Sequence, residues 1–91
     1  SCSRKGPKFV EYKYMAGSAQ YCEHKNMKFM IGSNFIDFDD CTRCTCYNHG
    51  LQCCGIGANA GVFGVPGCEA VNDHCELVFL KKNTDQLCFI N

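Results

Sequence analysis

The sequence predicts a small all-β, disulfide-rich protein built as two lobes. Ten of its 91 residues are cysteine, a share above the roughly 8–10% that marks a disulfide scaffold in a short secreted chain. Short runs of aromatic and β-branched residues are separated by turn residues, and no stretch keeps a helical apolar period. A glycine-rich segment divides the chain. We therefore expect short strands on both sides of a linker, with disulfides compensating for a thin core.

Residues 8–15 form the first predicted strand, because the run Lys-Phe-Val-Glu-Tyr-Lys-Tyr-Met is rich in residue types that favour strands. Alternation places Val10, Tyr12 and Tyr14 on one face, while the other face begins at Phe9. Two amphipathic faces that carry lysines suit an edge strand. A Gly-Ser pair ends the run.

Residues 27–31 and 34–38 are predicted as a second and a third short strand, joined by a Gly-Ser-Asn turn. Three acids, Asp37, Asp39 and Asp40, follow the third strand. The spacing and the central glycine of an EF-hand calcium loop are absent. We therefore interpret the three acids as solvated side chains.

Residues 41–56 are predicted as a hairpin crossed by disulfides. If its turn is centred on the Asn-His pair, Cys44 lies directly opposite Cys53. Cys46 and Cys54 then need partners elsewhere. A turn of three or four residues would shift the register, so the pattern alone leaves the pairing open.

The second half of the chain begins with residues 55–67, whose five glycines and one proline predict a loop or linker. Residues 76–80 and 87–91 are then predicted as the two strands of a second hairpin around a polar loop. The predicted organisation is an N-terminal lobe over residues 1–54 and a small C-terminal lobe over residues 68–91.

Charge and hydropathy narrow the class of protein. Nine basic and nine acidic side chains give zero net charge, which argues against a nucleic-acid partner. No run of about 18 apolar residues is present, so we expect no membrane-spanning helix. The start at Ser1-Cys2, without an initiator Met, fits a secreted protein after removal of a signal peptide. Basic residues outnumber acids in residues 1–28, which indicates either ordinary solvated faces or a surface that steers an acidic partner.

Cysteine chemistry other than disulfides is disfavoured. Cys41 and Cys44 have the CxxC spacing of zinc and redox sites, and His49 lies nearby. Ten cysteines with an adjacent pair exceed any single zinc site, and the βαβ context of a redox CxxC is missing. The histidines and acids lie in no recognisable catalytic motif. We therefore expect structural disulfides and no catalytic residue, metal or cofactor.

Aromatic and basic residues on the predicted strands are the candidates for binding a partner. Aromatic side chains on an edge strand can anchor a partner or fill a core, and we expect one face of each strand to serve each purpose. Lysines beside them would steer the partner's approach. The candidates are Lys8, Phe9, Val10, Tyr12, Lys13 and Tyr14, with Phe35 and Phe38 on the second candidate strand.

The order of the cysteines over residues 1–91 resembles the β-microseminoprotein family, the prostate secretory proteins. The motif that carries the resemblance is CxxCxCY followed by a CC pair. Here it reads Cys41-Thr-Arg-Cys44-Thr-Cys46-Tyr47 with Cys53-Cys54, between Cys2 and Cys22 before it and Cys68, Cys75 and Cys88 after it. A partly similar order occurs in von Willebrand factor C modules, so the whole order is needed. Within the family, the chain is most similar to the small serum proteins of venomous snakes.

The resemblance implies a fold and a disulfide pattern. The fold is a Greek-key antiparallel N-terminal lobe followed by a smaller C-terminal lobe of short two-stranded sheets. Ten cysteines allow roughly 945 pairings, among which sequence alone cannot choose. The resemblance implies the set Cys2–Cys54, Cys22–Cys46, Cys41–Cys75, Cys44–Cys53 and Cys68–Cys88.

The resemblance also implies a function, which is binding without catalysis. The expected partner is a cysteine-rich secretory protein, such as a venom toxin neutralised in the serum of the animal that makes it. Association through the edge of the N-terminal sheet is implied as well. The sequence leaves two alternatives open, an inhibitor of a venom metalloproteinase and a seminal or secretory protein that acts as a homodimer. Because residues 55–67 and much of the N-terminal sequence depart from the mammalian members, individual contact residues do not transfer.

Overall fold

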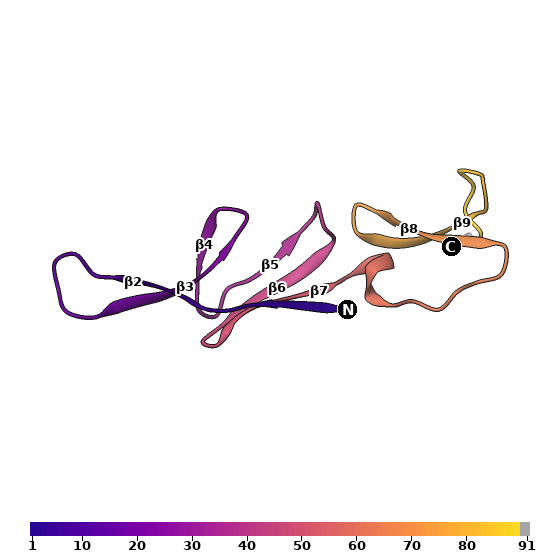
Figure 1. The fold of residues 1–91 in the computed structure, drawn as a ribbon. Helices are drawn as coiled ribbons and strands as arrows, with labels where there is room; N and C mark the ends of the chain where they lie inside the picture. The colour runs from indigo at the N-terminus through magenta and orange to yellow at the C-terminus, as the bar shows by residue number, and fades with distance from the viewer. Residues whose placement is uncertain (90–91) are drawn as a thin grey trace.

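The computed structural model describes residues 1–89, which form an elongated molecule of 60 × 20 × 18 Å (Figure 1). Within this range the strands make three antiparallel sheets of four, three and two strands. The helical structure of the same range is the short 3₁₀ turn η1 (Gly57–Ala60). The predicted all-β, disulfide-rich fold is therefore confirmed.

The four-stranded sheet has Greek-key topology. It contains β1 (Cys2–Lys5), β5 (Asn34–Asp37), β6 (Thr42–Tyr47) and β7 (Gly50–Gly55) in the order β1-β7-β6-β5. Three consecutive strands are neighbours, and β1 joins them from a distant part of the chain, beside β7. The β6–β7 turn is centred on the Asn-His pair, so the predicted register is confirmed, including the Cys44–Cys53 cross-strand pair.

The three-stranded sheet contains β2 (Lys8–Glu11), β3 (Ser18–His24) and β4 (Met27–Met30) in the order β2-β3-β4. The predicted strand over 8–15 is too long. Its second half bends back toward β3, and the backbone N–H of Tyr12 donates to the carbonyl of Gly17 at 3.0 Å. Gly17 has a φ of 104°, a backbone conformation that glycine accepts more readily than other residues.

The C-terminal sheet is a hairpin of β8 (Cys68–Asp73) and β9 (Glu76–Lys81). The predicted pairing of residues 76–80 with 87–91 is confirmed only in part. Among the described residues it is limited to the antiparallel Leu80–Leu87 bridge, beside which the N–H of Cys88 donates to the carbonyl of Phe79 at 2.8 Å. The strand that pairs with β9 along its whole length is β8, which was not predicted. Residues 90 and 91 lie outside the described range. The preference for β8 follows from the tight two-residue turn, in which His74 and Cys75 both have positive φ.

We call the two sheets of residues 2–55 the N-terminal lobe and residues 68–89 the C-terminal lobe. The segment predicted as a linker begins with regular structure, at the place where the two lobes meet. Its first residue, Gly55, ends β7, and η1 follows. The N–H of Ala58 donates to the side-chain oxygen of Asn72 in β8 at 2.7 Å. The start of the segment is therefore attached to the C-terminal lobe.

Five disulfides replace a conventional core. Phe35 packs against a buried cluster that consists of Leu51 and four half-cystines. The half-cystines are Cys22, Cys44, Cys46 and Cys53. Four of the bridges lie within a lobe, and Cys41–Cys75 joins the lobes. The bridges are Cys2–Cys54, Cys22–Cys46, Cys41–Cys75, Cys44–Cys53 and Cys68–Cys88. These are the five pairs that the resemblance implies.

Candidate partner-binding edge

β2 is an edge strand, because β3 is its neighbour on one side and none of the described residues pairs with its other side. All four of its residues are exposed. Hydrogen-bonded pairs alternate along antiparallel strands. Since Tyr12 bonds to Gly17, alternation directs the main-chain groups of Val10 toward β3. The N–H and C=O groups of Phe9 and Glu11 therefore point to the unpaired side.

Apolar side chains flank this unpaired edge. Phe9 is 62% exposed and Val10 is 47% exposed, and as consecutive strand residues they lie on opposite faces. Lys8 begins the strand and is exposed. A partner strand beside β2 would therefore meet one apolar side chain on each face and a positive charge at the start of the strand.

The other candidates from the first predicted strand lie in the loop between β2 and β3. Tyr12, Lys13 and Tyr14 follow the end of β2, so the predicted alternation does not extend to them. The Lys13 ammonium lies 5.6 Å from the centre of the Tyr14 ring, a cation–π distance. Tyr14 is 91% exposed. This loop extends the candidate surface beyond the strand at one end of the molecule (Figure 1).

Phe35 does not belong to the exposed surface. Its ring stacks on Phe29 with centres 4.1 Å apart, and it lies 5.6 Å from the His24 ring. It is half-buried against the sulfur-rich cluster. Phe35 is therefore a packing residue of the N-terminal lobe.

Phe38 lies at the junction of the lobes, away from β2. Its ring stacks on His74, with centres 4.5 Å apart and planes inclined by 5°. The Cys41–Cys75 bridge links the same two segments. The second candidate strand therefore contributes no residue to the surface around β2.

The opposite edge of the same sheet, β4, exposes an apolar surface for which the sequence predicted no binding role. Met27 and Met30 are 57% and 76% exposed, and Ile31 beyond the strand is 43% exposed. The Lys28 ammonium lies 5.0 Å from the Tyr21 ring centre. The composition could have indicated this exposed surface. A chain with so small a core cannot bury three more large apolar side chains, so some of them must lie on the surface.

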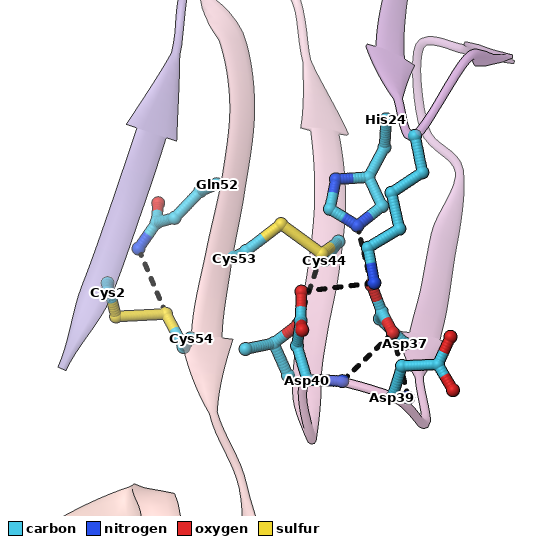
Figure 2. Close-up of a disulfide and its surroundings, with 11 residues drawn as sticks. Cys2, His24, Asp37, Asp39, Asp40, Cys44, Gln52, Cys53 and Cys54 are labelled. Atoms are coloured by element: carbon cyan, nitrogen blue, oxygen red, sulfur yellow. Dashed lines mark hydrogen bonds and ion pairs between the residues drawn. A yellow bond between two sulfur atoms is a disulfide. The ribbon is translucent and has the colours of Figure 1, made fainter.

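Asp37 is the centre of a polar cluster that positions the three-stranded sheet (Figure 2). Its Oδ2 atom accepts hydrogen bonds from His24 Nε2 (2.7 Å) and Lys25 Nζ (2.8 Å). Its Oδ1 atom accepts the backbone N–H groups of Asp39 (2.9 Å) and Asp40 (3.1 Å). Asp37 is buried, so the interpretation of all three acids as solvated is wrong for this one.

Electrostatics keep this cluster charged. The Lys25 ammonium and, next, the His24 ring hold the pKa of the Asp37 carboxyl well below its usual range. The hydrogen bond to Asp37 raises the pKa of Lys25 in return. Lys25 occupies the β3–β4 turn and Asp37 ends β5. The ion pair therefore ties the sheet that carries β2 to the four-stranded sheet.

Covalent and polar contacts reinforce the same connection. The Cys22–Cys46 bridge joins β3 to β6. The side-chain amide of Gln20 donates to the backbone carbonyl of Asn48 in the β6–β7 turn. β3 is thus attached to the rest of the lobe near both of its ends, which makes β2 an edge on a fixed support.

Two groups of potential metal ligands lie near this support. His24, Asp37 and Asp40 approach one another, but the Lys25 ammonium lies 2.8 Å from one carboxylate and 3.2 Å from the other. The second group combines His24 with two sulfurs, Cys44 and Cys53, which are bonded to each other. The carboxylates of the first group therefore already contact Lys25, and the two sulfurs of the second group are already bonded in a disulfide.

No family model matches the chain, and no solved structure matches it. Within residues 1–89, no helix is long and apolar enough to cross a membrane. The five disulfides are consistent with an extracellular protein.

Proposed function

We propose that this chain is a secreted, non-enzymatic binding protein that captures a cysteine-rich secretory protein by pairing one of its strands with β2. Because the order of the cysteines resembles that of the small serum proteins of venomous snakes, we propose a venom toxin as the partner. The proposed role is neutralisation of that toxin in serum. The observation that carries the proposal is the unpaired outer side of β2.

Main-chain pairing would supply affinity. In β-augmentation, the partner's backbone bonds to an open edge, and side chains on alternate positions give specificity. The outward groups of Phe9 and Glu11 are available for such bonds. The exposed rings of Phe9 and Tyr14 are of the type that dominates binding energy in protein interfaces.

Positive charge would steer the encounter. Lys5, Lys8 and Lys13 lie in or next to β2 and the loop after it, and Glu11 is the acid among them. Such an excess accelerates association with an acidic surface and is screened by salt. We expect the association rate to fall as ionic strength rises, while dissociation changes little.

The test removes one outward N–H from the edge and leaves the sheet paired. Glu11→Pro deletes a donor that points away from β3, where proline is tolerated in an edge strand. Glu11→Ala is the matched control, since it removes the same side chain and keeps the N–H. Surface plasmon resonance with a purified venom cysteine-rich secretory protein measures both variants. We expect at least a tenfold loss for Glu11→Pro, about one hydrogen bond's contribution, and near-unchanged affinity for Glu11→Ala.

Equal affinity of both variants, with amide spectra that show intact β2–β3 pairing, would rule out capture through this edge. Two further measurements address the alternatives. Sedimentation of the free protein shows whether a second copy occupies the edge. Dose-dependent loss of a venom metalloproteinase's activity would favour the inhibitor instead.

A further inference from the structure

A cleft of about 540 Å³ lies where the two lobes meet. Its volume falls in the range of roughly 300–1,000 Å³ that is typical of small-molecule sites. Three parts of the chain line it: strands β5 and β6 with the residue after β5, the segment around η1, and the start of β9 with the turn before it. The cleft is separate from the β2 edge.

Apolar surface makes up somewhat more than half of the cleft walls. Ile36 comes from β5, Ile56 and Val62 flank η1, and Leu77 comes from β9. All four side chains are half-buried, so each retains surface that a ligand can cover. An alkyl chain or an aromatic ring in the cleft would remove that surface from water, which is favourable at about 25 cal/mol per Å².

Arg43 supplies a free positive charge beside this apolar wall. It lies directly opposite Ile36 in the β5–β6 register, so the two side chains share a face of the sheet. Within residues 1–89, Arg43 forms no ion pair with a carboxylate. A guanidinium group offers a planar set of donors that matches the two oxygens of a carboxylate.

Two other polar side chains line the cleft, His74 and Glu76. The His74 ring stacks on Phe38, which leaves the edge of the ring as the source of a further hydrogen bond. Glu76 is exposed at the start of β9 and also forms no ion pair within the described residues. Groups that can donate to an anion therefore outnumber the one acid, which would repel it.

We propose that the interlobe cleft binds a small apolar carboxylate, with its carboxylate on Arg43 and its apolar body against Ile36, Ile56 and Leu77. A neutral molecule of the same shape would lose the bond to Arg43. An ammonium compound would meet Arg43 as a like charge. The site is independent of strand capture at β2.

The experiment uses three probes with the same eight-carbon body: octanoate, octanol and octylamine, each below its micelle concentration. Isothermal titration calorimetry with the full chain should give saturable one-to-one binding of octanoate, weaker binding of octanol and the weakest binding of octylamine. Arg43→Gln should weaken octanoate about tenfold, as expected for loss of a charge-assisted bond, and should remove its advantage over octanol. Glu76→Gln should tighten octanoate.

Arg4→Gln is the matched control, because Arg4 is exposed on β1 and does not line the cleft. It should leave octanoate binding unchanged. Methyl chemical shifts of Ile36 and Leu77 locate the ligand, and amide spectra verify that each variant is folded. The proposal is overturned by absence of saturable binding, by equal affinity for the three probes, by preference for octylamine, or by equal losses in the Arg43 and Arg4 variants. Loss of toxin binding in the Glu11→Pro variant with octanoate binding intact would show that the two sites are separate.

Discussion

The N-terminal lobe and the C-terminal lobe are both made of short antiparallel strands closed by disulfides, yet they hold their strands together differently. In the N-terminal lobe, two sheets enclose Leu51 and four buried half-cystines. The C-terminal lobe is a single hairpin, and its one buried residue among those described, Cys75, is bonded to the other lobe. Disulfide sulfur can therefore itself fill a core where two sheets meet, whereas a lone hairpin relies on its cross-links.

The two lobes should differ most in how they respond to removal of a disulfide. Cys22→Ala with Cys46→Ala removes both a cross-link and part of the buried cluster, so it should lower the free energy of unfolding by about 2–5 kcal/mol. Cys68→Ala with Cys88→Ala removes a bridge outside that cluster. Hydrogen exchange resolves the lobes. Loss of protection in β3 and β6 is expected from the first double variant, whereas the second should leave those strands protected.

The next effect concerns aliphatic side chains. Leu51 is 2% exposed and belongs to the buried cluster, so Leu51→Ala should cost about 2–4 kcal/mol. Leu77, half-buried in β9, is the matched position in the other lobe, and Leu77→Ala should cost clearly less. Urea unfolding followed by circular dichroism compares the two. Equal costs would mean that the lobes share one core.

Two aspartates of the N-terminal lobe, the buried Asp37 and the exposed Asp39, should contribute differently to the free energy of unfolding. Asp37→Asn keeps the size of the side chain but removes the charge that Lys25 and His24 contact, so it should cost about 1–3 kcal/mol. Asp39→Asn is the control, because that side chain is exposed and should stay within about 0.5 kcal/mol of the parent protein. The same urea measurement distinguishes them, and similar values would contradict an anchoring role for Asp37.

The smallest effect is a dependence on pH. The pKa of Asp37 is lowered in the folded protein, so below pH of about 4 the unfolded chain binds a proton that the folded chain does not. The contribution of Asp37 to stability is therefore complete above that pH and decreases as the pH falls toward the folded pKa. Unfolding free energies measured between pH 5 and pH 2 should decline less steeply in the Asp37→Asn variant. If the free energy of unfolding falls equally steeply with pH in the parent protein and the variant, the ion pair of Asp37 is not the cause of the pH dependence.

The sequence indicated the fold best where local chemistry decides it. A turn centred on the Asn-His pair was one of the registers that the sequence allowed for the β6–β7 hairpin, and it is the one observed, with Cys44 opposite Cys53. β1 and β3 were not predicted, because runs such as Ser-Ala-Gln-Tyr-Cys have weak strand propensity and are strands here by virtue of their neighbours. Strand β8 of the C-terminal lobe was missed for a similar reason. The His74-Cys75 turn lacks the asparagine and glycine that usually mark such hairpins.

The candidate site was predictable in outline. Strand propensity located the exposed edge at Lys8, Phe9 and Val10, but not the bend that moves Tyr12 off the strand. The role of Asp37 was missed, although alternation places it on the same strand face as Phe35. A charge on a face that also carries a packed aromatic residue is the signal of a buried pair. Its partners, His24 and Lys25, are set by tertiary structure.

The Cys41–Cys75 bridge has a consequence for survival in a fluid that contains proteases. The bridge and the chain between its ends form a closed covalent ring, and the glycine-rich segment 61–67 lies inside that ring. A single cut in that segment opens the ring without releasing either lobe. The nicked molecule would gain one water in mass and would separate into two fragments only after reduction. The covalent frame of the protein would thus survive one cut in this largely exposed segment.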